Sequence, residues 1–130
     1  MDAIVIEGIE FYGFHGATPE EQRIGHRYLV DVELCLSLEA AGESDDLADT
    51  VDYGVVASRI VQIGTVQQCR LLEALAERMA AALLAELPVE RVRLRIRKPC
   101  PPMPVIAAAA GVEIQRTRAP DTAGPPGLVV

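Results

Sequence analysis

The chain is poor in the residues from which metal centres and disulfide frameworks are built. Its 130 residues include three cysteines, two histidines and no tryptophan. These residues are scattered along the chain, at Cys35, Cys69, Cys100, His15 and His26. No HxxxH or CxxC pair occurs among them, so the sequence predicts free thiols and no dedicated metal site.

Positive charge and long apolar runs are also scarce. The chain carries 12 Lys and Arg against 19 Asp and Glu, and its pI is near 4.8. This acidic balance opposes binding to nucleic acid, which needs clustered cations to neutralise phosphates. No apolar run approaches the roughly 20 residues that span a bilayer, and the N-terminus has no secretory pattern. We therefore expect a cytoplasmic protein with no membrane contact and no nucleic-acid partner.

Apolar residues are abundant and make up 50% of the chain. A chain of this length with so many apolar residues can bury one core but has little room for two. We predict a single domain over residues 1–118. The segment 119–130, which contains DTAGPPG, is typical of a flexible C-terminal tail.

Four segments alternate between apolar and polar residues with the period of a half-buried strand. They are residues 3–11, 28–38, 91–97 and 112–115. In the first segment the apolar parity changes at Glu7 and Gly8, which predicts a β-bulge. One apolar face is expected to run through all four strands.

Two helices are predicted between the second and third strands. Apolar residues recur at helical spacing over 54–67 and 71–87, and Pro88 ends the second pattern. The connection 39–52, rich in Asp, Gly and Ser, predicts a loop. This order of elements favours an α+β fold, a four-stranded antiparallel sheet with two helices on one face. The other face carries acids on one strand and arginines on another, which favours cross-strand ion pairs.

Lys98 is unusual because it ends the third strand on the same parity as Val92, Leu94 and Ile96. One interpretation is a strand-end lysine that extends its ammonium group to water. The other is a partly desolvated amine suited to proton transfer. The alternation pattern alone does not choose between them.

Two further residues have both a structural and a functional interpretation, and a third has only a structural one. Glu73 lies in the first turn of the second helix, where the helix dipole favours a carboxylate, but it could also bind a guanidine-like ligand edge. Tyr53 precedes the first helix, where it could pack on the protein or stack on a flat heterocycle. Glu21 lies in the polar segment TPEEQR, which predicts a solvated loop.

Several short stretches, taken together, resemble the dihydroneopterin aldolase family. They occur in the family's order and cover about residues 3–116. The stretches are FYGFHG at 11–16, EQRIG at 21–25, YLVDVEL at 28–34, SDDLADTVDY at 44–53, LLEALAE at 71–77, and KP at 98–99 with PPMP at 101–104. FYGFHG also stands out by itself, because its glycines predict a turn with unusual backbone angles. The segment VIAAAA at 105–110 departs from the family pattern.

The resemblance implies a tunnelling fold, in which the sheets of several subunits join into a β-barrel. It also implies a homo-oligomer, an octamer or a tetramer, with active sites at the subunit interfaces. The uncovered charged face of the sheet is then expected to line the central channel.

By the same resemblance, six positions are expected to form the active site. Lys98, Glu21 and Tyr53 are similar to the family's catalytic residues. Glu73 and the backbone of Leu72 resemble its pterin anchor. Tyr53 corresponds to the tyrosine that stacks on the pterin from the adjacent subunit, and Asp52 to a position where the family's backbone contacts the ring. Glu21 also contacts the substrate.

The implied reaction is the retro-aldol cleavage of 7,8-dihydroneopterin, a step of folate biosynthesis. The products are 6-hydroxymethyl-7,8-dihydropterin and glycolaldehyde, and acid–base chemistry suffices without a metal, Schiff base or other cofactor. Two alternatives remain open, a dihydroneopterin (phosphate) epimerase and a non-catalytic pterin-binding oligomer.

Overall fold

A computed structural model of the protein describes residues 1–119. The predicted tail 119–130 therefore lies almost wholly outside the described residues. The elements in chain order are β1 (Ala3–Gly13), α1 (Pro19–Ile24), β2 (His26–Cys35), α2 (Glu39–Ser44), a 3-10 turn (Leu47–Asp49), α3 (Tyr53–Val66), α4 (Leu72–Glu86), β3 (Arg91–Pro99) and β4 (Ala109–Thr117). None of these helices is long and apolar enough to cross a membrane.

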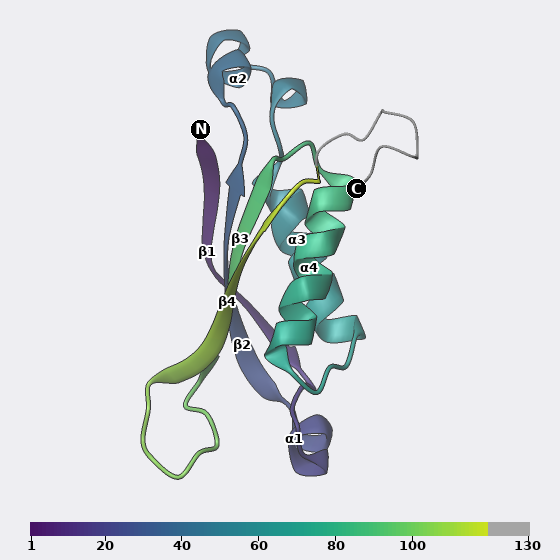
Figure 1. Cartoon of the computed structure of the whole chain (residues 1–130), viewed down its shortest axis with the longest axis vertical. Coiled ribbons are helices and arrows are strands. Elements are labelled where there is room, and N and C mark those ends of the chain that lie inside the picture. The colour runs from purple at the N-terminus through teal and green to yellow at the C-terminus, as the bar shows by residue number, and fades with distance from the viewer. Residues whose placement is uncertain (120–130) are drawn as a thin grey trace, which may run out of the picture.

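The four strands form one antiparallel sheet in the order β1-β2-β3-β4 (Figure 1). The predicted bulge in β1 is confirmed, because the register with β2 shifts between Ile6 and Ile9. Gly8 has a φ of 68° there, a backbone angle that favours glycine. Its N–H donates to Asp31 Oδ1 at 2.7 Å, so the bulge is tied to the neighbouring strand.

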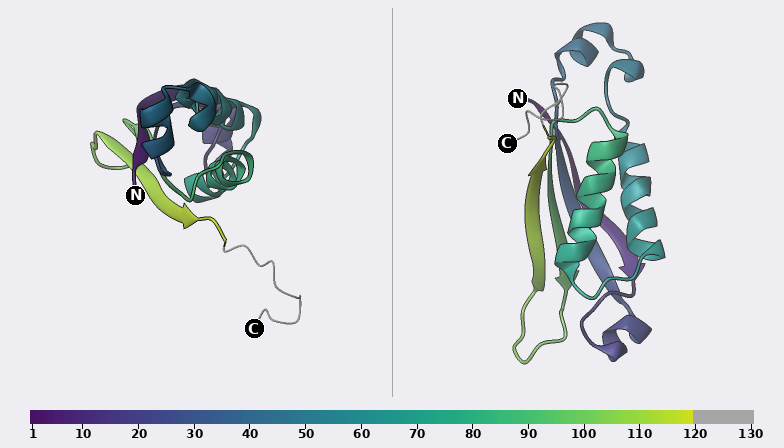
Figure 2. Two further views of the ribbon diagram at one scale, coloured as in Figure 1. Left: turned by 90° about the horizontal axis from the view of Figure 1, so that it is seen from above. Right: turned by 45° about the vertical axis from the view of Figure 1, so that its right-hand side comes forward.

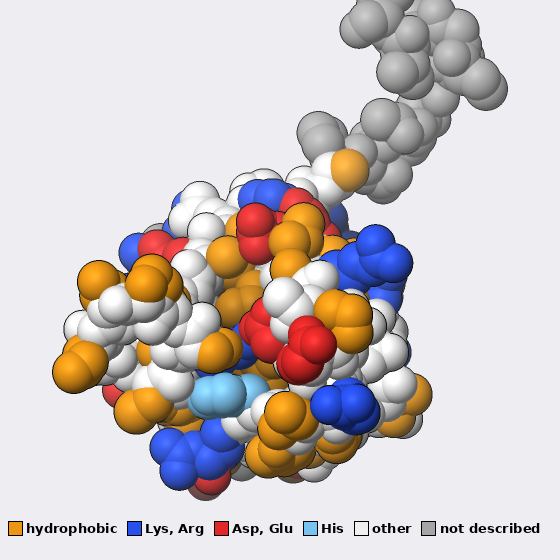
Figure 3. All heavy atoms as spheres, turned by 90° about the horizontal axis from the view of Figure 1, so that it is seen from below, with side chains coloured by type: hydrophobic (Ala, Val, Ile, Leu, Met, Phe, Trp, Pro, Cys, Tyr) orange, Lys and Arg blue, Asp and Glu red, His pale blue; other side chains and the backbone are white. Residues whose placement is uncertain are grey.

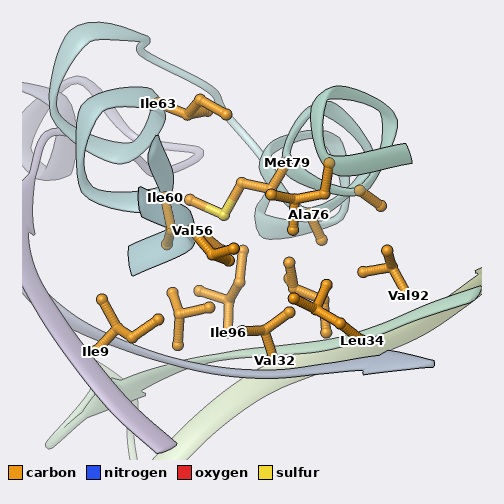
Figure 4. Packing of buried hydrophobic residues seen from close by; sticks show 14 of the residues in the cluster. Ile9, Val32, Leu34, Val56, Ile60, Ile63, Ala76, Met79, Val92 and Ile96 are labelled. Atoms are coloured by element: carbon orange, nitrogen blue, oxygen red, sulfur yellow. The ribbon is translucent and has the colours of Figure 1, made fainter. Parts of the chain in front are cut away.

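Helices α3 and α4 lie side by side on one face of the sheet, as predicted (Figures 1 and 2). Their apolar stripes meet the apolar parity of the strands in one core, part of which is shown in Figure 4. The buried side chains from these elements include Tyr28, Val30, Val32, Leu34, Val92, Leu94 and Ile96 on the sheet and Val56, Ile60, Ile63, Leu75, Met79 and Leu83 on the helices. Burying each such large apolar side chain stabilises the fold by about 1.5–3 kcal/mol.

The opposite face of the sheet is not covered by the described helices, and its charges pair across strands as expected. Arg97 lies 2.9 Å from Asp31, and Arg93 and Arg95 lie 3.1 and 3.0 Å from Glu113. These half-exposed pairs each contribute little to stability, because water screens them. Their main consequence is a face on which opposite charges alternate.

Two segments that were predicted as loops contain short helices. The connection 39–52 includes α2, which ends at Asp45 in the left-handed conformation, and a 3-10 turn capped by Asp46. Strand β2 ends at Cys35, three residues before the predicted end, because Leu38 already begins α2 as its N-cap.

The polar segment around Glu21 was also predicted as a loop, and this prediction is wrong. It forms α1, with Thr18 as N-cap and Pro19 at the first helical position. Proline is favoured at that position because its missing N–H would have no partner within the helix.

Candidate functional site

Lys98 and Glu21 form an ion pair that is largely shielded from solvent. Lys98 Nζ lies 2.9 Å from Glu21 Oε2, and the side chains are 10% and 25% exposed. The alternation of β3 turns the lysine toward the helix-covered side, where Nζ also lies 5.5 Å from the ring centroid of Tyr28. Its ammonium group is therefore held by a carboxylate and an aromatic face rather than extended into water.

Helix α1 holds the carboxylate of Glu21 in place. The Glu21 N–H donates to Thr18 Oγ1 at 3.2 Å, and the Thr18 hydroxyl donates to Glu21 Oε1 at 3.0 Å. Each carboxylate oxygen thus has a partner, Thr18 for one and Lys98 for the other. The hydrogen bond from Lys98 is the main cause that lowers the pKa of Glu21 below its usual value. Glu21 is therefore an ionised carboxylate that Thr18 and Lys98 hold in a fixed orientation.

A pocket of about 210 Å³ opens beside this pair. The polar side chains that line it come from the β1–α1 connection, α1, the start of β2 and the end of β3, and they include His15, Glu20, Glu21, His26 and Lys98. Figure 3 views this end of the molecule, where a histidine and acidic side chains surround a hollow. Proton donors and acceptors thus line a small, partly open pocket.

A larger hollow of about 620 Å³ lies on the uncovered face of the sheet. It is lined by the paired charges of that face, among them Asp31, Arg97 and Glu113, and it does not include Lys98. Because its charges already neutralise one another and it is open to solvent, the smaller pocket is the better candidate for chemistry.

The start of α4 lies at the same end of the molecule as this pocket (Figure 1). The segment before α4 is tied to the α1 region, since Gly16 N–H donates to the Cys69 carbonyl at 3.0 Å and Gln68 Nε2 donates to the Gln22 carbonyl at 3.1 Å. Glu73 is exposed in the first turn of α4. The N-cap is apolar Leu71, which makes no capping hydrogen bond, so the first N–H groups of α4 can serve a ligand.

Asp52 and Tyr53 lie elsewhere. They form the start of α3, which Figure 1 shows at the opposite end of the helix pair, close to α2. Asp52 caps α3 by accepting from Gly54 N–H at 2.9 Å, and Tyr53 is 68% exposed. Within one chain, four of the six expected site residues share one end, and these two do not.

Two residues of the site were missed by the reasoning from sequence. His15 and Tyr28 are both buried, and the Tyr28 hydroxyl donates to the His15 carbonyl at 2.8 Å. Burial is the main cause that lowers the pKa of His15 and raises the pKa of Tyr28. The signal for His15 was its place in FYGFHG, and the signal for Tyr28 was its parity on the face that ends in Lys98.

A metal centre finds no support in the part of the chain that the structure describes. Within residues 1–119, no three His, Cys, Asp or Glu side chains are grouped so that they could hold a metal ion. Cys35 and Cys69 are buried free thiols and Cys100 is an exposed one.

Comparison with known proteins gives one consistent result. The family model for dihydroneopterin aldolase matches residues 4–115. The dihydroneopterin aldolase of Streptococcus pyogenes serotype M18 is 43% identical over 119 residues, which are 91% of this chain and 100% of that protein. The crystal structure of E. coli dihydroneopterin aldolase in complex with neopterin has a TM-score of 0.84 at 32% identity and covers 89% of this chain and 99% of its own. That of Burkholderia thailendensis dihydroneopterin aldolase bound to guanine has a TM-score of 0.75 at 28% identity and covers 91% and 92%.

Proposed function

The chain belongs to the dihydroneopterin aldolase family, and from that premise we propose that Lys98 and Glu21 form the proton-transfer centre for cleavage of 7,8-dihydroneopterin. The observation that carries this proposal is the 2.9 Å pair between the two largely buried side chains, which line a small pocket. General acid–base catalysis of this kind contributes about 10²- to 10⁴-fold to a rate.

The substrate supplies its own electron sink. In 7,8-dihydroneopterin the C6=N5 imine is conjugated with the ring and accepts the electron pair released when the C1′–C2′ bond breaks. The 2′-hydroxyl loses its proton, and C2′ becomes the carbonyl carbon of glycolaldehyde. A proton then adds at C1′ to give 6-hydroxymethyl-7,8-dihydropterin. Because these reaction steps balance without an oxidant, a metal or a Schiff base, we propose that no cofactor takes part.

The paired side chains suit both proton steps. Glu21, held by Thr18 and Lys98, can orient a water molecule that passes the 2′-hydroxyl proton on to its carboxylate. The pair can then return one proton through Lys98 to C1′ of the intermediate, so that both side chains regain their starting charge. The fixed geometry matters because reacting groups held in place remove part of the entropic barrier, roughly 7–11 kcal/mol at best.

We propose that Glu73 and the backbone N–H of Leu72 anchor the pterin ring. A carboxylate can accept two parallel N–H bonds from the 2-amino-4-oxo edge of the ring, and this geometry gives strong, specific binding. The bound neopterin and guanine of the E. coli and Burkholderia structures share that edge, which supports an anchor of this chemistry.

The remaining part of each site is proposed to come from a second copy of the chain. Tyr53 is exposed at the start of α3, at the end of the helix pair away from the pocket. There it is available to stack on a pterin held by a neighbouring subunit and to relay a proton. Strands β1 and β4 are the two edges of the four-stranded sheet, and such edges can pair between chains. We therefore propose a homo-oligomer, an octamer or a tetramer, with a shared β-barrel.

Incubation of the purified, chelator-treated protein with 7,8-dihydroneopterin tests this function. We expect glycolaldehyde and 6-hydroxymethyl-7,8-dihydropterin to form in equal amounts, which mass spectrometry can follow. An epimer without glycolaldehyde would identify a dihydroneopterin epimerase instead. Saturable binding without any product would identify a non-catalytic pterin-binding oligomer.

A further inference from the structure

His15 is a buried side chain with contacts to several elements, and the proposed reaction leaves it without a role. Its ring is almost fully buried, 1% exposed, at the end of β1. The ring Nε2 lies 2.7 Å from the Gly64 carbonyl at the end of α3, and Cys69 N–H donates to Nδ1 at 3.1 Å. One imidazole thus joins β1 to the end of α3 and to the segment that leads into α4.

The partners fix the protonation state of this imidazole. A backbone N–H can only donate, so Nδ1 must carry a lone pair, and a carbonyl can only accept, so Nε2 must carry the proton. His15 is therefore neutral with its proton on Nε2. Two glycines make room for the contact, since a Cβ at Gly13 would lie 2.8 Å from His15 Nε2 and a Cβ at Gly64 would lie 2.5 Å from the Phe11 ring.

His15 also supports the proposed catalytic lysine. Its ring meets the Tyr28 ring edge to face at 5.2 Å, and the Tyr28 hydroxyl donates to the His15 carbonyl. Lys98 contacts the same Tyr28 ring, because its Nζ lies 5.5 Å from the ring centroid. The same residue that holds Cys69, three positions before Leu72, thus also holds the ring beneath Lys98.

We propose that His15 is a positioning residue that fixes the start of α4, with its pterin anchor at Leu72 and Glu73, relative to Lys98 and Glu21. This inference rests on the proposed function of these residues. It assigns a role to the histidine of the FYGFHG stretch, to which the proposed chemistry gives none. The role depends on the neutral imidazole, because a protonated Nδ1 cannot accept from Cys69 N–H.

The surroundings of His15 favour the neutral form. Burial is the largest cause of its lowered pKa, and the cations Lys98 and Arg78 act in the same direction, while the Gly64 carbonyl opposes them. Tyr28 and Cys69, the titratable groups in contact, have raised pKa values and remain uncharged, and Glu21 is engaged by Lys98.

Two matched substitutions separate the two hydrogen bonds. Asparagine at this position, His15→Asn, places its Oδ1 close to the site of Nδ1 and can still accept from Cys69 N–H. His15→Gln can still donate to the Gly64 carbonyl but leaves Cys69 N–H without a partner. We expect His15→Gln to weaken binding of neopterin about tenfold, or about 1.4 kcal/mol, and to lower kcat, whereas His15→Asn stays within about threefold of the wild type.

The control for general destabilisation is Leu83→Ala, which opens the core in the second half of α4, away from the pocket. Its Tm should fall at least as far as that of His15→Gln while neopterin affinity is kept. If Leu83→Ala weakens binding as much, or if the two His15 variants bind alike, His15 is only a structural residue and the proposal is wrong.

A double-mutant cycle with Glu73→Ala tests whether His15 acts through the anchor. If it does, the double variant His15→Gln with Glu73→Ala should bind little worse than Glu73→Ala alone, because the anchor is already lost. Additive losses would overturn the proposal. A wild type that does not cleave dihydroneopterin, or a Glu73→Ala variant with full affinity, would instead count against the proposed function.

The pH dependence gives a readout that also works if His15→Gln does not fold. Because burial lowers the pKa of His15, the ratio of the neopterin affinities of the wild type and His15→Asn, whose amide does not titrate, should stay constant from about pH 8 to about pH 6.5 and fall only at lower pH. A ratio that already falls above about pH 6.5 would contradict a role for a buried, neutral imidazole.

Discussion

The two ends of the helix pair differ in how completely one chain builds them. At the end where α4 begins, Lys98 and Glu21 are enclosed, and each has a partner from another element. At the end where α3 begins, Tyr53 is 68% exposed and Asp52 bonds only to its own helix. One end is preorganised by contacts between elements of the same chain, and the other presents the exposed ring of Tyr53.

This difference follows from what each kind of group requires. A charged pair in an enclosed pocket must be oriented by rigid neighbours, because desolvated charges without good geometry destabilise a fold. An aromatic ring that stacks on a flat ligand needs only a fixed backbone and an open face. The Lys98 and Glu21 pair is therefore proposed to act within one chain, while Tyr53 of its neighbour stacks on the ring and relays a proton.

The largest effect should come from removing the proposed proton-transfer group. We expect Lys98→Ala to lower kcat for dihydroneopterin about 10²- to 10⁴-fold while neopterin affinity changes far less. Arg95→Ala, three residues earlier on the opposite face of β3, is the matched control and should keep its activity. Equal losses of kcat and affinity in Lys98→Ala would mean that the lysine binds rather than reacts.

Mixing two inactive variants tests whether the two ends meet between chains. Lys98→Ala and Tyr53→Ala should each be impaired alone. Co-expressed in equal amounts, they should recover activity, because random pairing of subunits leaves about a quarter of the shared sites with both residues intact. If the mixture stays as inactive as its parts while it forms mixed oligomers, each site is built from a single chain.

The pterin anchor should affect binding first. We expect Glu73→Ala to raise the Kd for neopterin about 10- to 100-fold, since hydrogen bonds to a charged group are each worth about 1.5–3 kcal/mol. Glu77→Ala, one turn further along α4, removes a carboxylate that pairs with Arg116 on the surface and serves as the control. Calorimetric titration of both variants gives the comparison, and similar Kd values for the two would contradict the anchor.

The difference between the ends also explains what could be predicted from the sequence. The sheet, its bulge at Gly8 and the two long helices follow from apolar periodicity, because each element buries one regular face. The position of Lys98 on the apolar parity of β3 was predicted correctly for the same reason. These features depend only on spacing along the chain.

The short helix α1 was missed although its signal was present. Thr18 followed three residues later by Glu21 is a capping-box spacing, and Pro19 is favoured at the first helical position. The network around His15 could not be predicted in this way, because Gly64 and Cys69 are 49 and 54 residues away in sequence. The positions of Asp52 and Tyr53 at the far end likewise depend on how α3 crosses the sheet.

The Lys98 and Glu21 pair should also be visible in stability against pH. The pKa of Glu21 is lowered in the folded state, so the pair's contribution is present above the unfolded carboxyl pKa and is lost as pH falls through the folded one. The difference in free energy of unfolding between the wild type and Lys98→Met, on the order of 1 kcal/mol, should be constant near neutral pH and shrink in acid. Urea denaturation at several pH values measures it, and a difference that grows in acid would contradict the pairing.

The smallest effects should come from substitutions at two helix N-caps. They compare the two ends of the helix pair directly, because one cap lies at each end. Thr18 caps α1 and Asp52 caps α3, so Thr18→Ala and Asp52→Ala should each lower the free energy of unfolding by about 1 kcal/mol. Thr18→Ala should also lower kcat several-fold, because it frees the Glu21 carboxylate that the Thr18 hydroxyl orients. Asp52→Ala should leave kcat near the wild-type value, since only the backbone at Asp52 is proposed to contact the ring. A larger kcat loss in Asp52→Ala than in Thr18→Ala, at equal stability, would show that the side chain of Asp52 takes a direct part in the reaction.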